Sequence, residues 1–137
     1  MSLNKRRSAW VLLSFLLTFI VLRLYLHQFP GTNLDVAGYN IHHLYTGLLL
    51  LTVGGLPLIL FSGNNRWLDT AALAFGAGLS MALDEWVYLI ATDGSDTSYL
   101  SPVSLWGGVV MVSLTLAYAL AIIIIAIRYA HCKQTQD

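Results

Sequence analysis

Charged residues are scarce in this sequence. Only 10% of its 137 residues are Asp, Glu, Lys or Arg, whereas an ordinary soluble domain contains about 25%. The apolar share is 57% and the mean hydropathy is +0.69. So few charges cannot cover the surface of a 15.1 kDa globule, which excludes a water-soluble single domain. The same composition excludes a disordered chain, which needs high charge and low hydrophobicity.

Other classes of protein are excluded by residues and motifs that the chain lacks. Cys132 is the single cysteine, so it forms no internal disulfide and no Cys-x-x-Cys metal site. The formal net charge is zero, which leaves no basic field to attract nucleic acid. A glycine-rich phosphate loop and a Gly-x-Ser-x-Gly motif are both missing, so we expect neither a nucleotide cofactor nor a serine hydrolase. What remains is a polytopic protein whose surroundings are the lipid bilayer.

Four apolar segments are long enough to cross a bilayer, which takes about 20 residues. They cover approximately residues 9–26, 41–61, 67–91 and 103–129. The sequence therefore predicts an all-α fold, in which residues 1–137 form a single domain, a four-transmembrane-helix bundle. The first segment has the basic start of a signal peptide, but no small-x-small cleavage site follows it. We therefore expect it to be a retained helix.

The charged residues predict an orientation for these helices. If the helices alternate in direction, one end of the bundle collects the basic residues Lys5, Arg6, Arg7, Arg66, Arg128 and Lys133. Five acidic residues fall at or toward the other end: Asp35, Asp84, Glu85, Asp93 and Asp96. By the positive-inside rule both termini are cytoplasmic. Aromatic rings that suit the membrane interface lie near the predicted span ends, at Trp10, Trp67, Tyr99, Trp106 and Tyr129.

Two pairs of ionisable residues lie within the predicted spans, His42–His43 and Asp84–Glu85. Such residues are costly inside a membrane and therefore mark candidate sites. A helix rises about 1.5 Å per residue, which puts both pairs roughly 26–27 Å from the cytoplasmic ends of their spans. The short segment 63–66 makes the second and third spans antiparallel neighbours. The sequence thus places imidazoles opposite carboxylates, just inside the outer interface.

Small residues predict which faces of these helices meet. Ala72, Gly76, Ser80 and Asp84 follow an i, i+4 pattern, a stripe that lets two helices approach closely. His43 and Gly47 form a matching start on the second span. We therefore expect this stripe to pack against the second span, with His43 and Asp84 pointing into the bundle.

The first span adds a positive charge near the same depth. Arg23 can reach outward by extending its side chain, and His27 follows one turn later on the same face. Both side chains could line one outward-facing cavity with the two ionisable pairs. Arg23 is better explained as a counter-ion to Asp84 or Glu85 than as a phosphate ligand.

This set of side chains suits a metal ion. Imidazoles and carboxylates on facing helices are ligands for Zn, Fe or Mn, and we take His42, His43, Asp84 and Glu85 as the candidate ligands. An open coordination position would hold a water activated by the metal, and a lipid-like amphiphile would be the substrate at that depth. The chain has no Glu-x-x-His or His-Glu-x-x-His motif, and a bis-histidine haem is disfavoured because the histidines lie near the rim.

The alternative is a purely structural cluster. Asp84 paired to Arg23, and a histidine donating to Glu85, would fix the register of the helices without binding a ligand. The protein would then be a non-catalytic membrane subunit, and its small-residue stripes would recruit a partner or a second copy. Whether the chain is an enzyme stays open between these two hypotheses.

Two segments resemble a family of small, uncharacterised, four-span prokaryotic membrane proteins. Residues 41–47 carry the pattern His-His-x-x-x-Gly, and residues 76–85 carry Gly-x-Gly-Leu-x-x-x-x-Asp-Glu. Tyr99, Ser101 and Ser104 fill the outer loop that follows in this pattern. The resemblance implies a shared site at the two ionisable pairs and a prokaryotic cytoplasmic (inner) membrane, and it implies no particular reaction.

Overall fold

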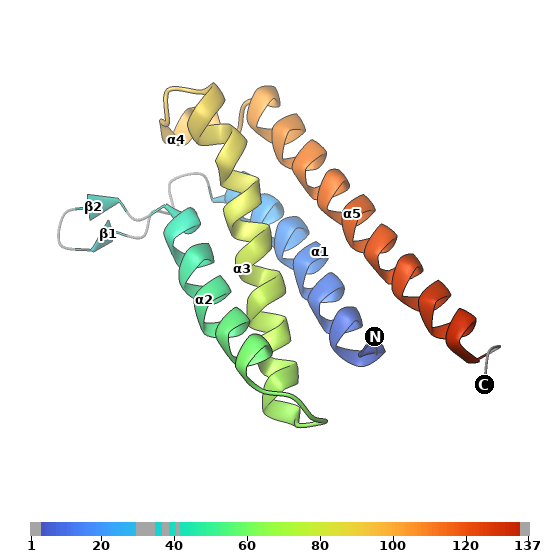
Figure 1. Ribbon diagram of the computed structural model, residues 1–137. Helices are drawn as coiled ribbons and strands as arrows, with labels where there is room; N and C mark the ends of the chain where they lie inside the picture. Colours follow the sequence, from blue (N-terminus) through green and yellow to red (C-terminus); the bar gives the residue numbers. More distant parts are fainter. Residues whose placement is uncertain (1–3, 30–34, 37–38, 41, 135–137) are drawn as a thin grey trace.

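A computed structural model of the protein describes residues 4–29, 35–36, 39–40 and 42–134, with side chains for residues 4–29, 42–95 and 97–130. It is an all-α helical bundle, as the sequence predicts (Figure 1). The long helices are α1 Lys5–Gln28, α2 His43–Leu60, α3 Arg66–Ala91 and α5 Pro102–Gln134. Three short elements complete the described part: β1 Asp35–Val36, β2 Tyr39–Asn40 and α4 Asp96–Tyr99.

All four long helices are long and apolar enough to cross a membrane, α5 over Pro102–Ala130. Their bounds agree with the four predicted spans to within a few residues. Residue 41, the predicted start of the second span, lies outside the described residues. Asn4 caps α1 by accepting a hydrogen bond from the Arg7 backbone N–H at 3.2 Å, and α5 starts at Pro102, where a proline ring suits the first turn. The protein is an integral membrane protein.

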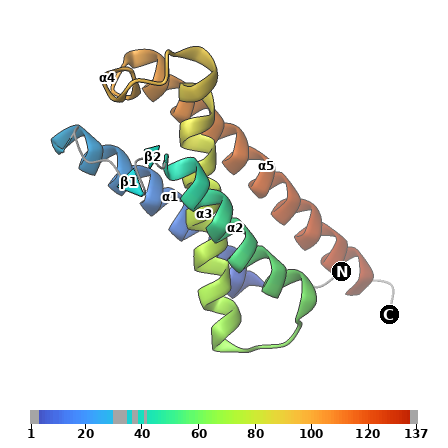
Figure 2. The same ribbon diagram turned by 90° about the vertical axis from the view of Figure 1, so that its left-hand side faces the viewer.

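Helix α3 is the centre of the bundle, since α1, α2 and α5 each pack against it (Figures 1 and 2). Its sequence contributes more buried residues than any other described helix, among them Leu68, Ala72, Ser80 and Tyr88. The other long helices leave large apolar side chains exposed along most of their length. Lipid tails cover such surfaces in a bilayer, so both close packing of small residues and polar contacts with α3 contribute to the arrangement of the helices.

Glycines bring α2 and α3 into backbone contact. A Cβ atom on Gly78 would lie 2.6 Å from the Gly47 carbonyl oxygen, and one on Gly54 would lie 2.5 Å from the Ala71 carbonyl oxygen. Any larger side chain at these positions would push the helices apart. The close approach brings the start of α2 against the C-terminal half of α3.

The small-residue stripe of α3 faces α1, and the prediction that it packs against the second span is wrong. A Cβ on Gly76 would meet the Ser14 Oγ at 2.1 Å and the Val11 carbonyl oxygen at 2.3 Å, both on α1. The residues of α3 that meet α2 are Ala71, one residue before Ala72, and Gly78, two residues after Gly76. Because neighbouring residues on a helix are about 100° apart, α3 has two small-residue faces, one for each neighbour.

The ends of the helices gather as the alternating topology requires. The start of α1, the turn between α2 and α3, and the end of α5 lie at one end of the bundle, and α4 lies at the other (Figure 1). The Arg7 guanidinium donates a hydrogen bond to the Gly63 carbonyl oxygen and so ties α1 to the α2–α3 turn. The basic residues of α1 therefore share an end with that turn.

Candidate functional site

Arg23 is the point at which four elements meet. Its Nε and Nη2 atoms lie 2.7 Å and 2.6 Å from the Asp84 Oδ1 on α3. Its Nη1 donates to the Tyr99 carbonyl oxygen on α4 at 3.2 Å, and its Nη2 donates to the Ser104 carbonyl oxygen on α5 at 3.0 Å. The guanidinium carbon also sits 4.3 Å from the centre of the Tyr99 ring. One side chain from α1 thus binds α3, α4 and α5 together.

Asp84 is fully buried, with 0% of its surface exposed. Besides Arg23, it accepts a hydrogen bond from the Tyr99 hydroxyl. Burial, together with the negative charge of Asp84, raises the pKa of Tyr99, which keeps this hydroxyl protonated as a donor. A Cβ at Gly108 would lie 2.6 Å from the Asp84 Oδ1, so the glycine on α5 provides the space that the ion pair occupies.

Glu85 is also buried, at 1% exposed, and binds the start of α2. Its Oε1 lies 2.7 Å from the His42 Nδ1, and its Oε2 accepts a hydrogen bond from the Leu44 backbone N–H. The first N–H groups of a helix have no partner within the helix, and a negative charge is favourable there. Glu85 therefore acts as a cap for α2 that is supplied by a different helix.

His43 lies between the two carboxylates. Its Nε2 is 3.5 Å from the Asp84 Oδ2, and its Nδ1 is 3.4 Å from the Glu85 Oε2. The ring packs edge-on against Tyr99, with 5.3 Å between ring centres. The Nε2 atom is buried and has no hydrogen-bond partner among the described residues.

The charges of this cluster do not cancel without a further positive charge. Arg23 contributes one positive charge, whereas Asp84 and Glu85 contribute two negative charges when ionised. Buried charges are costly unless they are balanced. The partial positive charge at the start of α2, which meets Glu85, offsets part of the remaining negative charge, and a bound cation is a second source of positive charge.

The predicted metal ligands come together in space, but they do not form a ready coordination shell. Among the described residues, no group of three or more His, Cys, Asp and Glu side chains is arranged to hold a metal ion. The carboxylate oxygens are already used by donors on Arg23, Tyr99, His42 and Leu44. A metal would have to replace some of these donors.

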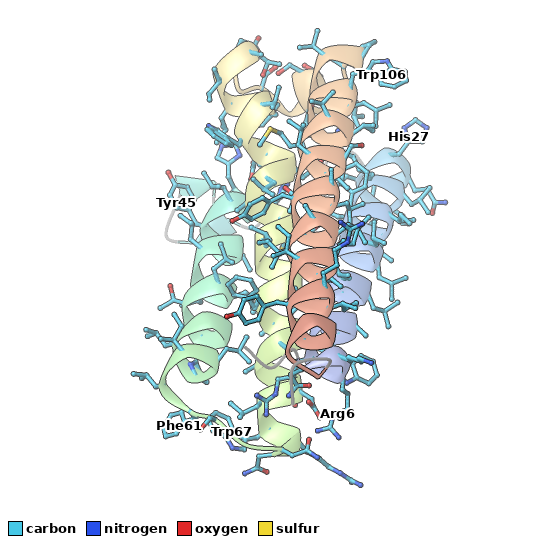
Figure 3. All side chains as sticks on the ribbon, turned by 45° about the vertical axis from the view of Figure 1, so that its right-hand side comes forward. Arg6, His27, Tyr45, Phe61, Trp67 and Trp106 are labelled. Carbon is cyan, nitrogen blue, oxygen red and sulfur yellow. The ribbon has the colours of Figure 1, made fainter. Side chains whose placement is uncertain are left out.

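His27 lies apart from the cluster, contrary to the prediction of a shared cavity. Its side chain is exposed on the outside of α1, as Figure 3 shows. The helical spacing predicts it on the face of Arg23, but α1 ends one residue later, at Gln28, and the His27 side chain is exposed there. The polar cluster of the described residues therefore comprises Arg23, His42, His43, Asp84, Glu85, Tyr99 and Ser104.

Tyr99 and Ser104 are the site residues whose roles the sequence did not indicate. The sequence predicts an interfacial anchor at Tyr99, whereas Tyr99 is 6% exposed and contacts both charges of the ion pair. Ser104 is 0% exposed and its Oγ lies 3.2 Å from the Arg23 Nη1. The short helix α4 places Tyr99 over the cluster, and no periodic pattern predicts a helix of 4 residues.

Comparisons with family models, with curated protein sequences and with solved structures find no match to this chain.

Proposed function

We propose that this protein is a non-catalytic subunit of a membrane assembly, in which the buried cluster locks the helices into one arrangement. The observation that carries the proposal is the set of bonds made by Arg23, which joins α1 to α3, α4 and α5. The donors that surround Asp84 and Glu85 come from the protein itself. A cluster whose polar groups bind one another has a structural role without any ligand.

In a membrane, a helix bundle needs such buried polar contacts for a specific physical reason. Lipid tails are as apolar as leucine side chains, so burying apolar surface does not select one helix face over another. Buried ion pairs and hydrogen bonds do select one helix face, because a misplaced helix would leave Arg23 or Asp84 without a partner in an apolar medium. The exposed apolar faces are then left for lipid and for a protein partner, which could be a second copy.

The charge distribution and the resemblance to prokaryotic proteins support a placement in a prokaryotic cytoplasmic membrane. Lys5, Arg6, Arg7 and Arg66 belong to the end that carries the α2–α3 turn. The positive-inside rule assigns this end to the cytoplasm. The cluster around Arg23 then lies toward the outer face.

A divalent metal site is the second candidate function. It is favoured by the His43 Nε2, which is buried without a hydrogen-bond partner, and by the positive charge that the cluster needs. His42, His43, Asp84 and Glu85 would supply the ligands for Zn, Fe or Mn once the metal replaces some of the donors that now bind the two carboxylates. The metal would supply a Lewis acid that activates a water, and a lipid-like amphiphile would be the substrate.

Elemental analysis of detergent-purified protein, together with melting temperatures, separates these two candidates. The test variant carries His43→Ala and Asp84→Asn, and a matched control carries His27→Ala and Asp69→Asn outside the cluster. The structural proposal expects no stoichiometric metal in any sample and a melting temperature that falls much further in the test variant than in the control, which loses the Arg6–Asp69 ion pair. About one equivalent of Zn, Fe or Mn in wild type and control, lost from the test variant, would overturn it in favour of the metal site.

Subunit status has its own test. Mild crosslinking in intact membranes, followed by purification, reports whether the chain has a neighbour. We expect a crosslinked species larger than the monomer in wild type, which disappears or weakens in Arg23→Gln. A protein that crosslinks to nothing at its native level of expression would contradict the assignment as a subunit.

A further inference from the structure

A basic hollow lies at the opposite end of the bundle from the cluster around Arg23. It has a volume of about 820 Å³ and lies between the start of α1 and the end of α2. Lys5, Arg6 and Arg7 line one side, and Leu58 and Phe61 line the other, with the turn residues 62–64 closing it. Figure 3 shows Arg6 and Phe61 at this same end of the molecule.

The charge of the hollow is positive even after the nearby carboxylate of Asp69, which does not line it, is counted. Lys5, Arg6 and Arg7 provide three positive charges, and Asp69 provides one negative charge, which leaves two. Asp69 Oδ2 lies 2.8 Å from the Arg6 Nη2, and Asp69 Oδ1 lies 3.9 Å from the Arg7 Nε. The Lys5 side chain makes no hydrogen bond or ion pair with any residue that the structure describes, so its charge is available to a ligand.

The shape and lining suit one class of ligand. The Arg7 Nε is buried and has no hydrogen-bond partner among the described residues, while its Nη2 is held by the Gly63 carbonyl oxygen. Arginine and lysine bind phosphate groups, and basic pockets between transmembrane helices on the cytoplasmic side bind anionic lipid headgroups. Leu58 and Phe61, the latter 54% exposed, offer an apolar wall at the same place.

We propose that this hollow binds the phosphate headgroup of an anionic glycerophospholipid, with Lys5, Arg6 and Arg7 on the headgroup and Leu58 and Phe61 against the first part of an acyl chain. An apolar wall beside three cations distinguishes a lipid from a free anion, which would gain nothing from it. The site would be occupied from the cytoplasmic leaflet, because the hollow is at the end to which the positive-inside rule assigns the cytoplasm. The proposal is independent of the function of the Arg23 cluster.

Lipid retention tests it directly. The full-length protein is purified from mixed micelles with equal amounts of dioleoylphosphatidylglycerol and dioleoylphosphatidylcholine, and the retained lipids are quantified by mass spectrometry. The test variant is Lys5→Gln with Arg6→Gln. The matched control is Arg66→Gln with Arg128→Gln, which removes two positive charges from residues that do not line the hollow.

We expect wild type and control to retain phosphatidylglycerol in preference to phosphatidylcholine, and the test variant to lose this preference by about fivefold or more. An equal loss in test and control variants would show attraction to surface charge in general, and no loss in the test variant would show no site. Either result overturns the proposal. If the double variant does not fold, Lys5→Gln alone replaces it, because Lys5 has no partner in the described structure.

A free anion is the remaining occupant to distinguish. Inorganic phosphate is added to protein in phosphatidylcholine micelles, and its melting temperature is compared with that in micelles containing phosphatidylglycerol. We expect a rise with the lipid and none with inorganic phosphate. A rise with inorganic phosphate, without any preference for retaining phosphatidylglycerol, would assign the hollow to a free anion and overturn the lipid.

Discussion

Asp84 and Glu85 are neighbours in the chain, yet their carboxylates hold different parts of the bundle. Asp84 binds Arg23 of α1 and Tyr99 of α4, whereas Glu85 binds His42 and the first turn of α2. The two residues point in different directions because they are about 100° apart on α3. His43, within 3.5 Å of both, links the two halves. Two adjacent residues of α3 thus bind α1, α2 and α4, and Arg23 extends the connection to α5.

Replacing Arg23 tests how much stability this arrangement supplies. Arg23→Gln leaves Asp84 buried without its counter-ion, which we expect to cost about 3–5 kcal/mol in the free energy of unfolding. Arg6→Gln is the control, because Arg6 forms an ion pair with Asp69 but is 46% exposed, and such pairs contribute about 0–1 kcal/mol. Unfolding in mixed micelles by titration with SDS measures both. Equal effects of the two variants would show that burial of the Arg23 pair is unimportant.

Two adjacent glycines on α2 give a second, purely steric prediction. A Cβ on Gly54 would lie 2.5 Å from the Ala71 carbonyl oxygen, whereas one on Gly55 would lie 3.4 Å from the Phe75 ring. We expect Gly54→Ala to destabilise the protein by about 1–3 kcal/mol, since two backbones must separate. Gly55→Ala should be neutral or stabilising by up to about 1 kcal/mol, because alanine favours a helix. The same SDS titration compares them, and a greater loss in Gly55→Ala would mean that the α2–α3 contact differs from the one described.

The sequence predicted the four spans and the meeting of imidazoles with carboxylates, because both follow from length and depth. Hydropathy locates each span, and a constant rise per residue brings His43 and Asp84 to the same level. The sequence could not assign the small-residue stripe at Gly76 to α1, since Gly78 offers an equally small face only two residues away. Choosing between such faces requires the packing of all helices together.

The contribution of Tyr99 shows a second limit of sequence patterns. An aromatic residue next to a span end is typical of an interfacial anchor, and nothing local distinguishes it from one that folds inward. Its inward position depends on α4, and Gly108 of α5 leaves room for the Asp84 carboxylate that Tyr99 contacts. Contacts that need three elements at once have no periodic signature in the chain.

Low pH should reduce the stability of the turn between α3 and α4. Hydrogen bonds from the Ser98 side chain, and then from Ser95, lower the pKa of Asp93 from 3.8 to about 2. The unfolded turn therefore binds a proton more readily than the folded one, so the contribution of Asp93 is complete above pH about 4 and is lost as the pH falls through about 2. Carboxyl chemical shifts of Asp93 in micelles measure this titration. Ser98→Ala should move the midpoint upward, and an unchanged midpoint would mean that Ser98 is not the main cause.

The orientation of the bundle can be tested with the single cysteine and one introduced thiol. Cys132 belongs to the end of α5, on the same side as the start of α1, whereas Thr97 is exposed on α4 at the other end (Figure 1). A membrane-impermeant maleimide applied to intact cells should therefore label Thr97→Cys in a Cys132→Ser background. It should label the native Cys132 only after the cells are lysed, because the positive-inside rule keeps the basic end in the cytoplasm.

Labelling of Cys132 in intact cells, with protection of Thr97→Cys, would show that the bundle has the opposite orientation in the membrane. The basic hollow around Lys5 and Arg7 would then face outward, and the Arg23 cluster would lie on the cytoplasmic side. Since the contacts within the bundle are the same in either orientation, the helix-locking role of Arg23 would survive such a result. The expected source of lipid for the hollow would change from the cytoplasmic leaflet to the outer one.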